Sequence, residues 1–116
     1  MKKEEKKMLV KHIDKDGGSG TRGNGLKWNG NGYFVSGADV VKVTPAGVFT
    51  TIGTIGTSTG RIEMVAGRSM FMLVDGALGY TYDGTTFGQI VDADFPANPI
   101  SCSWLFDYFA VCSSTP

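Results

Sequence analysis

The sequence predicts an all-β protein built from antiparallel β-meander repeats. Residues 69–90 read SMFMLVDGALGYTYDGTTFGQI, three short runs separated by Asp75-Gly76 and Asp83-Gly84. Asp and Gly tolerate the positive φ that tight hairpin turns require. The 116 residues include 17 Gly, seven Phe and four Tyr, with few charges outside the amino-terminal segment. This composition favours strands and turns over helices.

An internal repeat is the third observation. Aligning residues 33–43 with 72–82 places Gly37 on Gly76, 39 positions later, and Phe49 falls 38 positions before Phe87. A period near 40 residues with about four short strands per unit is typical of propeller blades. A plain antiparallel sandwich with evenly spaced strands is the alternative. The blade interpretation divides the repeat domain, residues 25–116, into two blades and the start of a third, over 25–56, 60–92 and 100–113.

Two segments precede the repeats. Residues 1–16 form a charged extension with six lysines and four acidic residues, and its first 13 residues are compatible with a short helix. Residues 17–24 form a Gly/Ser-rich linker. The run from Asp14 to Thr21 resembles the start of a calcium-binding loop, but Gly18 stands where a ligand is required. We therefore expect a linker there rather than a calcium site.

The first repeat contains four expected strands. Asn-Gly is the dipeptide that two-residue hairpins favour, and it separates the first strand from the second. Gly37-Ala38 and the stretch 44–47 supply the next two turns. The strands are expected at 26–28, 33–36, 39–43 and 48–52.

The second repeat follows a Gly-rich connection at 53–60, which lacks the Gly-Lys-Ser/Thr of a phosphate-binding loop. The run 70–74 is apolar at every position, so both of its faces are expected to be covered. A Pro-containing segment at 92–99 leads into the last expected stretch, 100–111. The strands of the second repeat are expected at 61–66, 70–74, 78–82 and 86–91.

The charge pattern excludes broad electrostatic binding to nucleic acid. The chain carries 11 basic and 11 acidic residues, and beyond residue 16 it has five basic against seven acidic residues. No apolar stretch approaches the length of a membrane span, and no secretory signal is visible. We therefore expect neither direct sequence-specific nucleic-acid binding nor membrane binding, and a cytoplasmic setting.

Few side chains in this sequence are suited to catalysis or to metal binding. His12 lies in the charged extension, and no Cys/His zinc pattern or Gly-x-Ser-x-Gly motif is present. Most of the aspartates occupy turn contexts, and the pair Asp92 and Asp94 is the best candidate for a cation. We expect no enzyme activity and no cofactor. Cys102 and Cys112 are interpreted as two buried free thiols, with a disulfide across one hairpin as the alternative.

Aromatic side chains are the other candidates for binding. Large rigid side chains of this kind could line a sugar- or protein-binding face. The candidates are Trp28, Tyr33, Tyr80, Tyr82, Trp104 and Tyr108. The same side chains are also needed for the core of a small β domain. Trp104 is assigned to the core, while Tyr80 and Tyr82 stay open.

A series of short motifs runs along the chain in a fixed order. The motifs lie at 22–23, 32–37, 43–47, 52–56, 60–64, 73–76, 79–83, 86–90, 92, 94–96 and 107–109. This ordered series resembles the early part of the packaged-DNA stabilisation proteins of short-tailed phages, also called tail accessory or head-completion factors. The similarity covers about residues 17–111, and the order of the motifs carries it rather than any single one.

The resemblance implies a structural role without catalysis. Members of that family are longer, propeller-containing virion proteins that join the portal to the tail machine and help to retain packaged DNA. It implies protein partners, namely portal or tail components or further copies of the chain, and a place in the virion or host cytoplasm. This chain stops after about two blades. It is therefore expected to be a fragment, to close as a homo-oligomer through its open strand edges, or to be reused for another role. The alternatives are a phage- or prophage-encoded binding or inhibitor module that targets a host protein, and a carbohydrate-binding β module.

Overall fold

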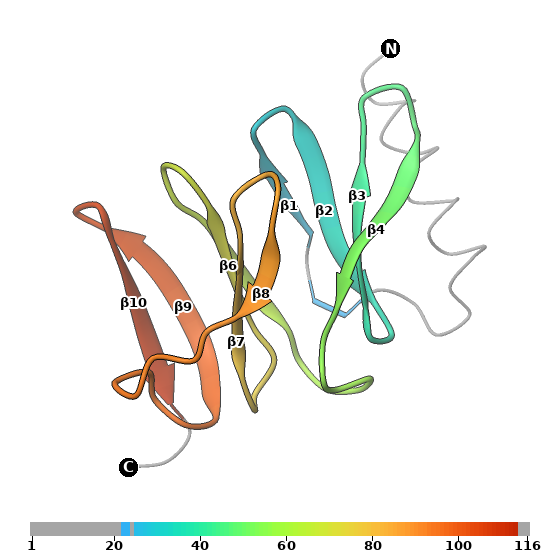
Figure 1. Cartoon of the computed structure of the whole chain (residues 1–116). Coiled ribbons are helices and arrows are strands. Elements are labelled where there is room, and N and C mark those ends of the chain that lie inside the picture. The colour runs from blue at the N-terminus through green and yellow to red at the C-terminus, as the bar shows by residue number, and fades with distance from the viewer. Residues whose placement is uncertain (1–21, 24, 114–116) are drawn as a thin grey trace.

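The chain folds into three antiparallel sheets that lie side by side (Figure 1). The computed structural model describes residues 22–23 and 25–113, and within them it contains strands and no helix. The first sheet consists of β1 (Leu26–Trp28), β2 (Asn31–Ser36), β3 (Asp39–Val43) and β4 (Phe49–Thr54). The second consists of β5 (Glu63–Ala66), β6 (Phe71–Val74), β7 (Gly79–Tyr82) and β8 (Phe87–Gln89). The third is the hairpin of β9 (Pro99–Leu105) and β10 (Tyr108–Ser113).

Both four-stranded sheets are meanders in which each strand pairs with the next along the chain. Gly37 and Gly76, aligned by the sequence repeat, lie with positive φ in the turns between the second and third strands of their sheets. Phe49 and Phe87 both begin the fourth strand. The predicted all-β antiparallel class is confirmed, while the propeller interpretation stays a prediction.

Local turn chemistry explains the hairpins. Asn29 and Gly30 have φ of 53° and 83°, so the predicted Asn-Gly turn joins β1 to β2. The Asp75 carboxylate accepts hydrogen bonds from the Ala77 and Leu78 amides, and Asp83 accepts equivalent bonds two and three residues ahead. These bonds replace the pairing that the backbone loses where a strand ends.

Strand limits differ from the predictions by a few residues. β2 begins at Asn31 rather than at residue 33, because Asn31 pairs with Trp28 immediately after the two-residue turn. β8 is shorter than expected and ends at Gln89. The amide of Ile90 then bonds the Gly79 carbonyl and redirects the chain toward the third sheet.

The second sheet contributes to the core on both of its faces. Leu73 and Tyr80 pack against Val35 and Val40 of the first sheet. The opposite face of β6 presents Met72 and Val74 to the third sheet. All four residues of β6 are buried, as its uninterrupted apolar run predicts. A second cluster between the first two sheets is aromatic and contains Trp28, Tyr33, Phe71 and Tyr82.

Several predictions concern residues outside the described ranges. The charged extension at 1–16, its possible helix, the calcium-loop resemblance at 14–21 and His12 all lie there. Of the predicted linker at 17–24, Arg22 and Gly23 are described. No helix in the described part of the chain has the length and apolar character needed to cross a membrane.

Candidate functional site

Most of the aromatic side chains predicted as a binding face lie in the interior, and Tyr108 is the exposed exception. Trp28 and Tyr82 belong to the aromatic cluster, with ring centroids 6.3 Å apart, and Tyr80 stacks on Phe87 at 5.5 Å. The Tyr80 hydroxyl accepts a hydrogen bond from the Gly56 amide. All three side chains are buried, so they hold the first two sheets together and present no exposed aromatic surface.

Asp92 and Asp94 are exposed, and their geometry is that of a turn. A carboxylate oxygen of Asp92 accepts a hydrogen bond of 2.9 Å from the Asp94 amide, and the Asp92 carbonyl accepts one from the Phe95 amide. Among residues 22–23 and 25–113, no group of three or more His, Cys, Asp or Glu side chains is arranged to hold a metal ion. The pair by itself supplies too few oxygens for a calcium shell.

Arg22 forms a polar junction between the first two sheets. Its side chain is 8% exposed. Nη1 donates to the carbonyls of Gly37 and Thr57 at 2.7 and 2.9 Å, while Nη2 donates to the Thr59 carbonyl at 2.6 Å. Nε donates to Gly60. One guanidinium therefore fixes a turn of the first sheet and the whole connection to the second.

A hydroxyl extends this junction to a buried carboxylate. Thr57 Oγ1 accepts a bond of 2.9 Å from Arg22 Nη2 and donates one of 2.9 Å to Asp75 Oδ2. The arginine and the carboxylate thus share one buried network, which satisfies charges that would otherwise be costly to bury. Sequence reasoning placed Arg22 in a linker, and its partners lie 15 to 38 positions away. The only local signal is Gly23, whose positive φ and contact with Ile62 require glycine.

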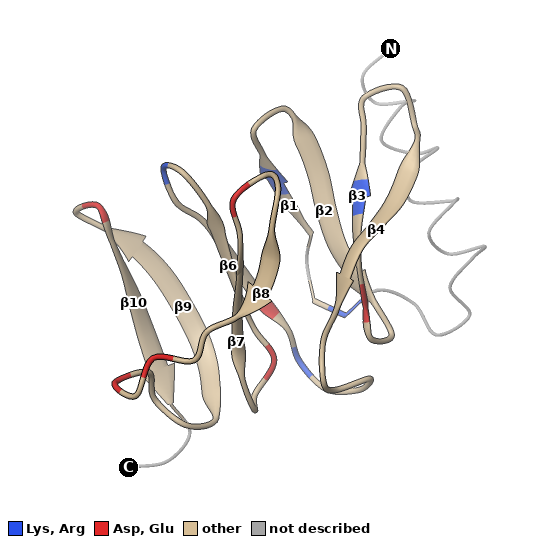
Figure 2. Ribbon diagram, in the orientation of Figure 1, with Lys and Arg blue, Asp and Glu red and all other residues tan. Residues whose placement is uncertain are grey.

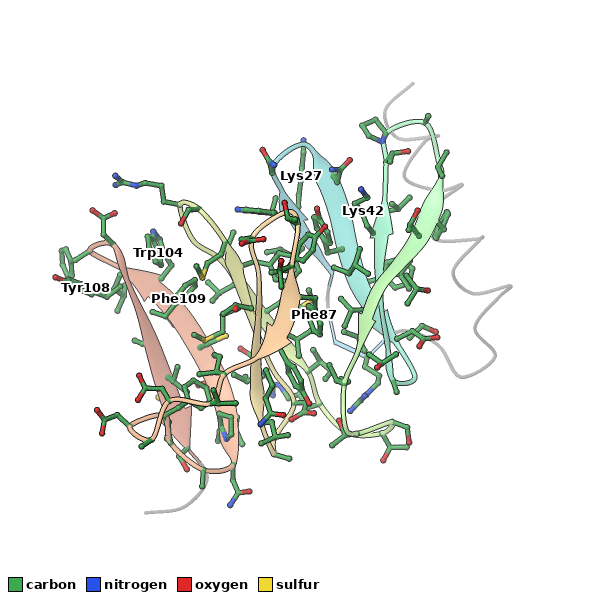
Figure 3. All side chains as sticks on the ribbon, viewed as in Figure 1. Lys27, Lys42, Phe87, Trp104, Tyr108 and Phe109 are labelled. Carbon is green, nitrogen blue, oxygen red and sulfur yellow. The ribbon has the colours of Figure 1, made fainter. Side chains whose placement is uncertain are left out.

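The third sheet carries most of the exposed apolar surface. Trp104 and Phe109 face the second sheet and pack over Gly67, whereas Tyr108 points away from the other sheets (Figure 3). β9 and β10 contain no charged residue, and the turn that joins them carries Asp107 (Figure 2). The exposed large apolar residues in this region are Val91, Ile100, Leu105, Phe106 and Tyr108.

The tip of this hairpin is strained as well as exposed. Phe106 is 91% exposed and has φ of 50°, and Asp107 has φ of 66°. Two positive φ values define the tight turn for which Asn-Gly is preferred, and a bulky residue in this conformation is unusual. Arg68, in the turn between β5 and β6, forms an exposed ion pair with Asp107 at 2.6 Å. The structure therefore presents a large exposed aromatic ring in a costly backbone conformation.

The two cysteines have different surroundings, and the prediction of two buried thiols is wrong for one of them. Cys102 is buried and Cys112 is exposed. Cys102 lies opposite Val111 in the register, so the two thiols project from opposite faces of the hairpin and no bridge forms between them. Burial, and to a smaller extent the Glu63 carboxylate, raises the pKa of Cys102 to about 11. Cys112 is therefore the accessible thiol.

Comparisons of the chain with family models, with curated proteins and with solved structures find no match. The exposed end of the hairpin, formed by Leu105, Phe106 and Tyr108, is the candidate functional site. It is defined by geometry alone: exposed apolar side chains at the end of a two-stranded hairpin, one of which, Phe106, has a strained backbone.

Proposed function

We propose that this chain is a non-enzymatic structural protein that acts through protein–protein contacts, of the packaged-DNA stabilisation or tail accessory type. The observation that carries the proposal is the hairpin end, where Leu105, Phe106 and Tyr108 are 53%, 91% and 75% exposed. Contiguous exposed apolar side chains on a folded protein mark a site of association. Aromatic residues are also the side chains enriched at protein interfaces.

The strained turn supports the same proposal. A positive φ at Phe106 costs stability, and such strain concentrates at functional sites. Glycine or asparagine would relieve it, so the ring contributes something that folding alone does not need. The packing of Trp104 and Phe109 against the second sheet keeps the hairpin rigid, which lowers the entropy lost on binding.

The ordered motifs that resemble those of phage tail accessory proteins suggest the class of partner, namely a portal or tail component. A phage-encoded module that binds a host protein would use the same hairpin end, so the identity of the partner separates these two functions. A carbohydrate-binding module would need several exposed aromatic rings. Of those predicted for it, Tyr108 is exposed, whereas Trp28, Tyr33, Tyr80 and Tyr82 are buried.

The test is site-specific photo-crosslinking in cells that produce the virus. A benzophenone amino acid replaces Phe106 in one variant and Val48 in the control variant. Val48 lies beside the first sheet, and its side chain is 56% exposed. Crosslinking to a portal or tail protein at position 106 and not at 48 supports the proposal. A host enzyme as the specific product favours the inhibitor alternative. Equal or absent crosslinking at the two positions overturns the assignment of this surface.

A further inference from the structure

Two Asn-Gly pairs of the first hairpin have the same sequence and different surroundings. Asn29 and Gly30 form the turn between β1 and β2, whereas Asn31 and Gly32 are the first two residues of β2. Asn29 and Gly30 are both exposed, and a Cβ placed on Gly30 would meet nothing within 4 Å. The first pair therefore lies in open solvent at the end of a hairpin.

The register on both sides of β2 determines the backbone bonds of the second pair. Trp28 and Asn31 close a two-residue turn, so they form a hydrogen-bonded pair, and the backbone groups of the next residue, Gly32, point toward β3. Counting from the turn at 37–38 gives the same result, because Gly32 and Val43 then form a hydrogen-bonded pair. The peptide between Asn31 and Gly32 is thus held by its carbonyl to β1 and by its amide to β3.

The peptide between Asn29 and Gly30 is not held in this way. Among the described residues, no hydrogen bond involves the Asn29 carbonyl or the Gly30 amide. The two residues have φ of 53° and 83°, which are the positive values of a type I′ turn. Type I′ and type II′ turns differ by rotation of this central peptide, while the strand ends stay in place. The rotation therefore breaks no backbone hydrogen bond.

We propose that Asn29 is a site of spontaneous deamidation in the folded protein, and that the ladder of the first sheet protects Asn31. Rotation of the central peptide brings the Gly30 nitrogen to Cγ of Asn29, and Gly30 has no side chain to obstruct this approach. A bond forms between these two atoms, the Cγ–Nδ2 bond breaks, and the proton of the Gly30 nitrogen leaves with Nδ2 as ammonia. Water then opens the five-membered imide. Opening at the α-carbonyl gives isoaspartate, and opening at Cγ gives aspartate.

The isoaspartate product changes the hairpin, because the chain then runs through Cβ of Asn29 and the turn gains one backbone atom. Trp28 ends the three-residue strand β1 immediately before this turn. Its ring is 9% exposed and lies edge-on to Phe71 and Tyr82, with centroids 5.7 and 6.3 Å apart. Loop length fixes the register of a hairpin, so a longer turn disturbs the register that places this ring in the core. Deamidation at Asn29 should therefore loosen the aromatic cluster between the first two sheets.

Site-resolved mass spectrometry of the full chain tests the proposal. The protein is incubated at mildly alkaline pH, once in buffer and once unfolded in guanidinium chloride, and is then digested briefly with trypsin. Asn29 and Asn31 share the tryptic peptide 28–42, and fragmentation of this peptide assigns the exchange of NH2 for OH to one position or the other. The unfolded sample is the control. Both residues precede glycine, so their rates in the unfolded chain should agree within about twofold.

In buffer, Asn29 should convert at least about tenfold faster than Asn31, because release of the Gly32 amide requires local opening of the sheet. Three results would overturn the proposal. They are equal rates in buffer, faster conversion at Asn31, and no conversion at Asn29 during a period in which the unfolded sample converts fully.

Asn29→Gly is the matched variant for the effect on the core. A Gly-Gly turn also suits a two-residue hairpin, so this variant should keep the fold while lacking the reactive amide. After incubation in buffer, tryptophan emission of the unsubstituted chain should shift to longer wavelength than that of Asn29→Gly. Asn24-Gly25 and Trp104 are common to both proteins, so their contributions cancel in the comparison. Unchanged emission after complete conversion of Asn29 would overturn the predicted loosening of the cluster.

Discussion

Replacement of Arg22 by Ala should destabilise the fold more than replacement of any exposed charged residue. The change removes five hydrogen bonds that the guanidinium donates. The carbonyls of Gly37, Thr57 and Thr59 lose a charged donor, and the Thr57 hydroxyl loses its link between Arg22 and Asp75. Asp75 is 5% exposed, so its charge stays buried without the compensating cation.

The magnitude follows from these losses. Removing one partner of a buried charged network costs about 3–5 kcal/mol. A domain of this size has a total unfolding free energy of about 5–13 kcal/mol, so the variant should lose a large part of its stability. The expected fall in Tm is roughly 15–30 °C. Arg22→Lys keeps the charge but not the planar fork, and it should cost about 1–3 kcal/mol.

The sequence repeat supplies a matched control. Arg61 lies 39 positions after Arg22, at the start of the second repeat, but its side chain is 79% exposed and pairs with Glu63 at 2.6 Å. Arg61→Ala should change the unfolding free energy by less than about 1 kcal/mol. Urea unfolding, followed by circular dichroism and tryptophan fluorescence, measures both variants and tests two-state behaviour. Equal losses in the two variants would refute the role assigned to the buried network.

Three further predictions concern the hairpin and the core. Phe106→Gly should relieve the strain of the turn and raise the free energy of urea unfolding by about 0.5–1 kcal/mol, and a loss of stability would contradict the strain assigned to Phe106. The same variant should abolish partner capture from the hairpin end. At pH 8 a thiol reagent should modify Cys112 rapidly and Cys102 only on unfolding, and equal labelling rates would count against this. The stability contributed by the neutral Cys102 thiol should be present below the ordinary cysteine pKa of 9.0 and should be lost as the pH rises through about 11, the pKa of Cys102 in the folded protein. Leu73→Ala, at a fully buried position, should cost about 2–5 kcal/mol by thermal unfolding, and a change under 1 kcal/mol would argue against the packing between the first two sheets.

The turns and the burial of β6 were predictable from the sequence because neighbouring residues determine them. Asn29-Gly30 lies in a turn because both residues adopt the positive φ of a tight hairpin. Asp75-Gly76 lies in a turn because Gly76 has positive φ and the Asp75 carboxylate accepts hydrogen bonds from the amides of the residues that follow. The uninterrupted apolar run of β6 predicted burial on both faces, which its position between two sheets explains. Periodicity and turn composition carry this information without reference to distant residues.

Side-chain roles that depend on distant segments were not predictable. Tyr80 is buried because Val35, Val40 and Ile55 cover it, and these residues lie far away along the chain. The partners of Arg22 are mainly backbone carbonyls, which every residue type provides and which leave no sequence pattern. The exposure of Cys112 follows from which face of the third sheet remains uncovered, and local alternation does not specify that face.

The second and third sheets differ in the side chains on the face that points away from the first sheet, and this difference bears on how the β9–β10 hairpin could make contacts. Val65 pairs with Met72 on the face of the second sheet that the third sheet covers. The equivalent pair of the third sheet is Ser103 and Ala110, both exposed and smaller. Covering this face with another sheet would bury little apolar area, so continued face-to-face stacking gains little free energy there. The large exposed apolar side chains of the third sheet lie instead at the hairpin end, at Leu105, Phe106 and Tyr108, which is why the proposed contacts are assigned there.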